Sequence, residues 1–115
     1  MQRILICGDR NYANFNKIEK YILTLPKDTT IVEGDCRGTD RISGYLARKH
    51  GLTDEKHPAN WDKYGLSAGP LRNQEMIDSK INIVTVFHEH LEDSKGTADT
   101  IRRAKTANIP ILINP

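Results

Sequence analysis

The sequence predicts a single α/β domain, residues 1–115, built on a doubly wound sheet of about five mostly parallel strands with helices on both faces. Short apolar runs alternate with segments whose apolar residues recur at helical spacing, as expected of parallel strands joined by helical crossovers. The length of 115 residues suits one such domain and is too short for a second. Glycine-bearing segments follow three predicted strands, which is typical of the ligand-binding edge of these sheets.

The first half of the chain predicts two strands and two helices in alternation. Arg3–Cys7 is mostly a continuous apolar run, typical of a strand buried on both faces. Phe15–Leu25 has apolar residues at helical spacing and ends before Pro26. Thr29–Glu33 is rich in β-branched residues and predicts a strand, and Thr39–His50 predicts the next helix. The inner face of that helix is expected to carry Ile42, Tyr45 and Leu46.

The second half continues the same alternation. Asp54–His57 is the weakest strand signal, and Ser67–Lys80 predicts a helix. Ile81–Phe87 is the strongest strand signal, Gly96–Ala107 predicts the last helix, and Ile109–Ile113 predicts the last strand. Strands that alternate with helices in this way are joined by right-handed crossovers and therefore lie parallel.

Three loops are candidates for binding an anion, because each lies between a predicted strand and a helix and contains glycine. Glycine lets backbone amides approach a phosphate, and the helix that follows directs its positive end toward it. Two of the loops also contain arginine, whose planar fork suits phosphate. We therefore predict a nucleotide-like ligand. The residues expected to bind it in these loops are Gly8, Asp9, Arg10, Gly34, Asp35, Arg37, Gly38, Thr39, Asp40, Ser94, Lys95, Gly96 and Thr97.

The longest segment without a predicted helix or strand, Pro58–Leu66, contains the only tryptophan, Trp61, and a tyrosine, Tyr64. An aromatic loop at the rim of a phosphate site can stack on a base. It can equally cover the edge of the sheet or form a dimer contact. The sequence leaves these alternatives open.

Composition narrows the classes of partner. The chain has 17 Lys and Arg against 15 Asp and Glu, and the excess positive charge is spread along it, so no nucleic-acid partner is expected. No apolar stretch approaches the roughly 18 residues of a membrane span, so no membrane partner is expected. The two cysteines, Cys7 and Cys36, favour reduced thiols and a cytoplasmic location.

Neither a metal nor another cofactor is expected. The best metal-ligand pattern is His88-Glu89-His90 with Asp93, and in an extended chain the two histidines would point to opposite sides. Structural roles compete with ligand binding elsewhere. Asp40 could stabilise a helix start, and Ser94 and Thr97 could cap the last helix.

Five motifs occur in order along nearly the whole chain: Gly8-Asp9-Arg10, Gly34–Asp40, Pro58-Ala59-Asn60-Trp61, Ala68–Met76 and Lys95–Asp99. Together they resemble the YspA-like, YpsA-related branch of the SLOG superfamily. This superfamily includes the LOG ("lonely guy") phosphoribohydrolases, which release a base from a nucleoside monophosphate, and sensor domains for nucleotide-derived signals. The resemblance implies a Rossmann-like fold, a nucleotide-derived ligand and, because LOG proteins form dimers, a homodimer or higher homo-oligomer.

The same resemblance indicates candidate catalytic residues. It also shows that this chain differs from the LOG enzymes at the position of their catalytic glutamate. Where LOG enzymes have a catalytic glutamate after a Gly-Thr motif, this chain has Thr100, and the nearest carboxylate is Asp99. One residue on a helix is a turn of about 100°, so Asp99 need not face the same way. Arg72 is a counterpart of the enzymes' arginine, and its neighbour Asn73 could bind a ribose or base.

Two functions follow from these residues. The first is a module that binds a nucleotide or a nucleotide-derived phosphate as a sensor or sequestering protein. The alternative is a phosphoribohydrolase with Asp99 or Glu75 as its carboxylate. Glu75 could instead pair with Arg72, which lies three residues before it on the predicted helix.

Overall fold

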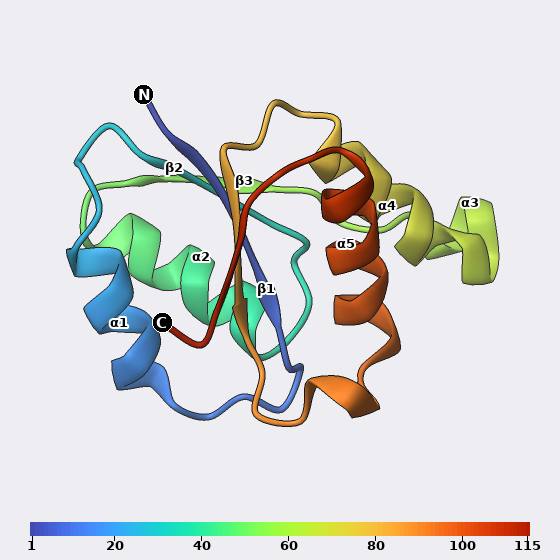
Figure 1. The fold of residues 1–115 in the computed structure, drawn as a ribbon, viewed down its shortest axis with the longest axis horizontal. Helices are drawn as coiled ribbons and strands as arrows, with labels where there is room; N and C mark the ends of the chain where they lie inside the picture. Colours follow the sequence, from blue (N-terminus) through green and yellow to red (C-terminus); the bar gives the residue numbers. More distant parts are fainter.

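The computed structural model describes residues 1–115 and contains one sheet of five parallel strands, as predicted. The order of the strands across the sheet is β3-β2-β1-β4-β5 (Figure 1). The chain therefore builds outward from β1 in one direction and then from β4 in the other, which places a switch in topology between these two strands. The strands are β1 (Arg3–Gly8), β2 (Thr30–Glu33), β3 (Thr53–Lys56), β4 (Ile83–Phe87) and β5 (Ile111–Ile113).

Helices cover both faces of the sheet (Figure 1). On one face α1 (Phe15–Leu23) packs beside α2 (Thr39–Lys49), and on the other α4 (Ala68–Ile77) packs beside α5 (Lys95–Thr106). The short helix α3 (Trp61–Tyr64) protrudes from the body beside α4. Two single-turn 3₁₀ helices complete the chain, η1 (Gly65–Ser67) and η2 (Leu91–Asp93). No helix combines the length and the apolar character that crossing a membrane requires.

The hydrophobic core has two layers because successive side chains of a strand point to opposite faces. In β1, Ile4 and Ile6 pack under α1 and α2, whereas Leu5 and Cys7 pack under α4 and α5. Fully burying one large aliphatic side chain contributes about 1.5–3 kcal/mol. Burial on both faces explains why the central strands are continuous apolar runs in the sequence.

Three sequence-based predictions are corrected locally. The segment expected to be irregular, Pro58–Leu66, contains α3, which starts because the Asn60 side chain accepts a hydrogen bond from the Lys63 amide. The predicted helix Ser67–Lys80 is shorter and spans Ala68–Ile77. Tyr45 is half exposed and packs against Phe15 at the surface instead of entering the core.

Candidate functional site

The three predicted glycine loops meet at the carboxyl end of β1. Thr39, at the start of α2, donates from its amide and its hydroxyl to the Asp9 carbonyl at 3.1 and 3.0 Å. Thr97, at the start of α5, donates from its hydroxyl to the Gly8 carbonyl at 3.2 Å. Ser94 caps α5 by accepting the Thr97 amide at 3.1 Å. Segments about 30 and 90 residues apart are thus joined at the topological switch.

Two of the glycines are required by close contacts. A Cβ at Gly8 would lie 2.0 Å from the Phe87 carbonyl oxygen, because β1 and β4 end side by side. A Cβ at Gly38 would lie 2.4 Å from the Arg10 carbonyl oxygen, and the φ of Gly38 is +78°. Gly96 differs, since no atom lies within 4 Å of the position its Cβ would take. The side of the first turn of α5 that carries Gly96 therefore faces open space.

Each of the three loops presents an exposed cation. Arg10, Arg37 and Lys95 lie in the first, second and third loops, and none of them forms an ion pair within the chain. Arg37 is oriented by a hydrogen bond from its Nη2 to the Asn11 side chain at 2.9 Å. Three cations without an ion-pair partner, at the edge of the sheet where α2 and α5 begin, favour the binding of an anion there.

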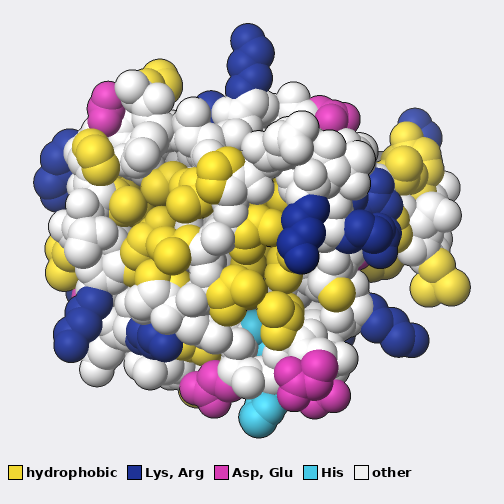
Figure 2. Space-filling model, in the orientation of Figure 1, with side chains coloured by type: hydrophobic (Ala, Val, Ile, Leu, Met, Phe, Trp, Pro, Cys, Tyr) yellow, Lys and Arg dark blue, Asp and Glu magenta, His cyan; other side chains and the backbone are white.

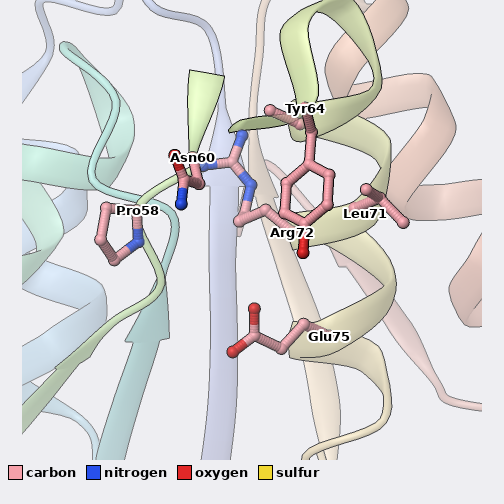
Figure 3. Close-up of a pocket in the computed structure, with 7 residues that line it drawn as sticks. Pro58, Asn60, Tyr64, Leu71, Arg72 and Glu75 are labelled. Atoms are coloured by element: carbon pink, nitrogen blue, oxygen red, sulfur yellow. The ribbon is translucent and has the colours of Figure 1, made fainter. Parts of the chain in front are cut away.

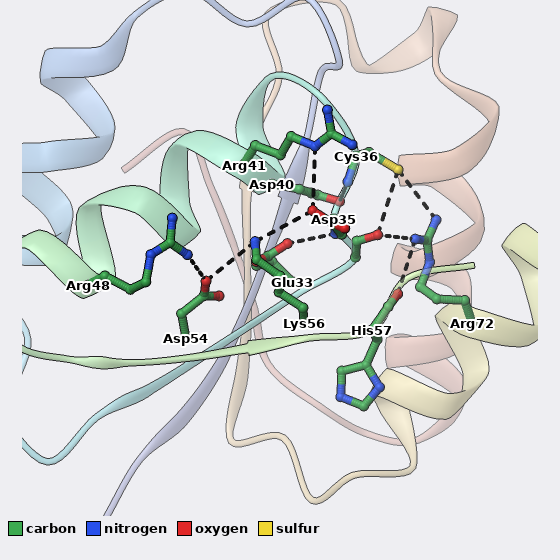
Figure 4. Close-up of polar contacts among 11 residues, drawn as sticks. Glu33, Asp35, Cys36, Asp40, Arg41, Arg48, Asp54, Lys56, His57 and Arg72 are labelled. Carbon is green, nitrogen blue, oxygen red and sulfur yellow. Dashed lines mark hydrogen bonds and ion pairs between the residues drawn. The ribbon is translucent and has the colours of Figure 1, made fainter. Parts of the chain in front are cut away.

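Arg72 of α4 connects this edge of the sheet to the segment after β3. Its Nη1 donates to the Gly34 carbonyl and, at 3.4 Å, to the His57 carbonyl (Figure 4). Its Nε donates to the Asn73 side chain at 2.9 Å. Its Nη2 has only a weak contact with the Cys36 sulfur at 3.7 Å. Most of the guanidinium is therefore engaged by the protein, and Nη2 is the part left to meet a ligand.

Asp40 braces the second loop from within. Its carboxylate is buried and accepts the Cys36 amide at 3.3 Å and the Gly34 amide. Burial raises the pKa of Asp40 to about 6, although these amides and the nearby Arg72 charge act in the opposite direction. The carboxylate that the sequence proposed as a ligand residue thus contacts the loop backbone.

A small pocket opens beside Arg72, between the segment after β3 and helix α4. Its volume is about 240 Å³, and Figure 3 shows the side chains around it. The residues that line it are Pro58, Asn60, Tyr64, Ala68, Leu71, Arg72 and Glu75. The pocket thus combines aromatic and aliphatic surface with one cation and one carboxylate.

The two aromatic residues of the predicted loop have different positions. Tyr64 lines the pocket, whereas Trp61 lies outside it with its ring against Gly69, 3.2 Å from where a Cβ would stand. Trp61 and Leu66 remain 54% and 93% exposed. Figure 2 shows hydrophobic side chains on the protruding end of the molecule that carries α3. This apolar end lies next to the pocket.

Asp99 does not line the pocket. Its carboxylate contacts Arg102 and accepts a hydrogen bond from Arg103 at 2.8 Å, both within α5. It also accepts from Asn73 of α4 at 3.1 Å, across the contact between the two helices. Burial acts to raise the pKa of Asp99, whereas the hydrogen bonds from Arg103 and Asn73 act to lower it. The hydrogen bonds together have the larger effect, so the pKa of Asp99 lies below its ordinary value. Asp99 reaches the site only through Asn73, which accepts from Arg72.

A hydrogen-bonded chain that sequence reasoning missed runs from the pocket into the sheet. The Glu75 carboxylate contacts His57 Nδ1 at 3.1 Å, and Nε2 of the same ring contacts Glu55 at 2.7 Å. Glu55 forms a two-point pair with Arg3 at 2.8 and 2.9 Å, and this bond lowers the pKa of Glu55 to about 2. Side chains alternate between the two faces of an extended segment, so Glu55 and His57, two residues apart, lie on the same face. This spacing could have predicted their contact from the sequence.

Sequence reasoning also missed Glu33 as a residue that supports the site. A charged residue at the end of an apolar run was the feature that could have indicated it. Its fully buried carboxylate accepts the Asp35 amide at 2.6 Å and the Lys56 ammonium at 2.7 Å (Figure 4). Burial raises the pKa of Glu33, and the neighbouring Asp54 carboxylate adds to this effect. Asp35 has a φ of 58°, so the Glu33 bond supports an uncommon backbone conformation in the second loop.

Of the two histidines considered as metal ligands, only His90 has its ring grouped with other ligand atoms. His88 is buried, and its Nδ1 accepts the His90 amide at 3.0 Å. His90, Glu92 and Asp93 do bring their ligand atoms within 4.8 Å of one another, but all three are exposed. Exposed acidic groups of this kind are common without an ion, and we assign no metal to them.

Comparison with known proteins places the chain in a family. A model of the YspA, cpYpsA-related SLOG family matches residues 2–64, and the chain belongs to this family. A "Gene 61 protein" of Mycobacterium phage D29 is 32% identical over 121 residues, covering 97% of this chain and 95% of the phage protein. The resemblance found in the sequence motifs is therefore confirmed.

The fold is similar to that of a larger protein. The X-ray structure of DNA processing protein A (DprA) from Streptococcus pneumoniae matches 98% of this chain with a TM-score of 0.80 and 16% identity. The chain spans half the length of that structure, and at this identity the similarity concerns the Rossmann-like fold alone. Membership of the SLOG family suggests a nucleotide-related function.

Proposed function

We propose that this protein binds a nucleotide or a nucleotide-derived phosphate at the carboxyl ends of its strands, as a sensor or sequestering module. The observation that carries the proposal is the position of Arg72, which lines the pocket and also contacts the Gly34 carbonyl of the second glycine loop. One ligand can therefore place a ring in the pocket and a charged group over the loops. The family's nucleotide-related character supports this choice.

The phosphate end of the ligand lies over the three loops in this proposal. Arg10, Arg37 and Lys95 supply positive charge that no ion pair within the chain engages, and the open space at Gly96 leaves room beside the start of α5. Helix starts bind phosphate through free amides and through their positive end. The guanidinium of Arg72 adds a further positive charge on the side of the pocket.

Calorimetry with nucleoside mono- and diphosphates tests the proposal. Arg37→Ala is expected to weaken binding by about 1.5–3 kcal/mol, the contribution of a charged hydrogen bond, which is roughly a 10- to 150-fold loss. Lys105→Ala is the matched control, because Lys105 is exposed in the last turn of α5 and lies outside the loops. Equal affinities for wild type and Arg37→Ala would contradict the phosphate assignment.

The alternative function is that of a phosphoribohydrolase that releases a base from a nucleoside 5′-monophosphate. Glu75 favours it, because this carboxylate lines the pocket and could stabilise an oxocarbenium-like state. Against it, the position of the LOG glutamate is Thr100, which is buried and donates to the Gly96 carbonyl. Chromatography after incubation with nucleoside monophosphates separates the functions. Base release that Glu75→Gln or Asp99→Asn abolishes would establish the enzyme, and intact bound nucleotide would support the binding module.

The name of the similar DprA structure raises DNA as a second kind of ligand. Binding to a DNA backbone depends on many phosphate contacts by Lys and Arg. This chain has a net charge of only +2, so we propose that DNA is not its ligand. Fluorescence anisotropy with labelled single and double strands tests this point, and salt-sensitive micromolar binding would contradict it.

A further inference from the structure

We propose that the pocket selects a base that carries two adjacent N–H donors, as guanine does, and that Glu75 is the residue that makes the selection. This inference rests on the proposed nucleotide-binding function and adds the class of base to it.

The shape of the pocket suits a flat ring. In Figure 3, Pro58 and Tyr64 lie on opposite sides of the opening, and the Glu75 carboxylate points into it from α4. The volume of about 240 Å³ is below the roughly 300–1,000 Å³ of sites that enclose a whole drug-sized ligand. The pocket therefore has room for a base, while the rest of the nucleotide lies outside it, toward the loops.

Glu75 is held in position although its side chain is 65% exposed. It shares a face of α4 with Leu71 and Arg72, since residues three and four apart on a helix are neighbours. One of its oxygens, Oε1, contacts His57, and the ring of His57 is fixed by Glu55, itself paired with Arg3. The other oxygen, Oε2, has no hydrogen-bond partner within the chain. An ionised carboxylate only accepts hydrogen bonds, so this solvent-facing oxygen is free to exchange water for a donor on the ligand.

Guanine matches this arrangement better than adenine does. One edge of guanine presents the N1–H and N2–H₂ donors side by side. Oε2 of Glu75 accepts one of them, and Oε1 accepts the other through the lone pair that its contact with His57 leaves free. The edge next to it carries the O6 and N7 acceptors, which suit the Nη2 donor that Arg72 has left. Adenine would direct the N1 lone pair toward the carboxylate beside its single amino donor. Hypoxanthine has the N1–H but lacks the 2-amino group, so it falls between the two.

Calorimetry on the full chain with GMP, IMP and AMP tests the inference. Wild type is expected to bind GMP at least about tenfold more tightly than AMP, with IMP between them. Glu75→Gln is expected to lose about tenfold or more in GMP affinity and to erase the preference, because the amide turns a donor toward the donors of the base. His57→Gln is expected to reduce the preference, since it releases Glu75. Asp28→Asn, which removes an exposed carboxylate before β2 at the opposite edge of the sheet, is the control and should retain the wild-type preference.

The outcomes distinguish this inference from the function on which it rests. Equal affinity for GMP and AMP, tighter binding of AMP, or an unchanged preference in Glu75→Gln would overturn the assignment of Glu75 and leave the proposed function standing. Failure of all three nucleotides to bind the folded wild-type protein would overturn both. Circular dichroism and melting curves of each variant ensure that a loss of affinity is not a loss of fold.

Discussion

Replacing Arg72 with methionine is expected to destabilise the protein even when no ligand is present. The substitution keeps an unbranched side chain of similar length but removes the donors to the Gly34 carbonyl and the Asn73 side chain, together with the weaker one to His57. It also removes the positive charge near the buried Asp40 carboxylate. If Arg72 only awaited a phosphate, the same change would reduce affinity and leave stability intact.

The magnitude follows from the contacts. A hydrogen bond from a charged donor contributes about 1.5–3 kcal/mol, and an unsatisfied buried acceptor costs about 1–3 kcal/mol. Arg72 is half-buried and water will replace part of the loss, so we expect about 2–3 kcal/mol in all. With about 2.1 cal/mol/K of unfolding entropy per residue, 115 residues convert this to a decrease in Tm of about 8–12 °C.

Differential scanning calorimetry of the ligand-free protein measures this change. Arg37→Met is the matched control, because Arg37 is exposed and makes only one side-chain hydrogen bond, to Asn11. The Tm of this variant should stay within about 2 °C of that of wild type. Arg72→Lys should be intermediate, since it keeps the charge but loses the fork. A Tm for Arg72→Met equal to that of wild type would refute the inference that Arg72 stabilises the fold. Arg72 would then be a candidate ligand-binding residue only.

Three further predictions concern stability and assembly. Because burial raises the pKa of Asp40 to about 6, its contribution to stability is fully present below its unfolded pKa near 4 and is lost as pH rises through 6. Urea unfolding from pH 4 to 7 should show this decline, and a profile in Asp40→Asn as steep as that of wild type would contradict it. Gly8→Ala should cost about 3 kcal/mol or more through its clash with the end of β4, whereas Gly96→Ala, which enters open space, should cost less than about 1 kcal/mol in the same assay. Comparable losses for the two variants would exclude the clash as the cause. The exposed apolar surface of α3, η1 and α4 is proposed to form a symmetric dimer contact, so analytical ultracentrifugation should show a dimer that Leu66→Lys dissociates, and a monomeric wild type at high concentration would rule it out.

The fold was largely predictable because its signals are local. Continuous apolar runs marked the strands, and apolar spacing marked the helices, so the order of the elements agrees with the structure to within a few residues at each end. The exception was α3, a single turn that starts at the Asn60 cap within a segment with no apolar repeat. A helix of four residues is too short to leave a periodic pattern in the sequence.

The candidate site was predictable only in outline. The glycine loops could be found from the sequence, because a parallel sheet brings the carboxyl ends of its strands to one edge, and the structure joins these loops through Thr39 and Thr97. The partners of Asp99 could not be found in this way. Its contact with Asn73 depends on how α4 packs against α5, and no spacing within either helix encodes that packing.

By itself the sequence determined the alternation of strands and helices, the positions of the glycine loops and membership of a nucleotide-related family. Only the tertiary structure decided that Arg72 donates to a carbonyl 38 residues away, and that Glu75 faces the pocket with His57 behind it. The physical reason is one of range. Backbone periodicity relates residues two to four apart, so it is visible along the chain, whereas the direction and the partners of a polar side chain depend on packed layers that come from distant segments.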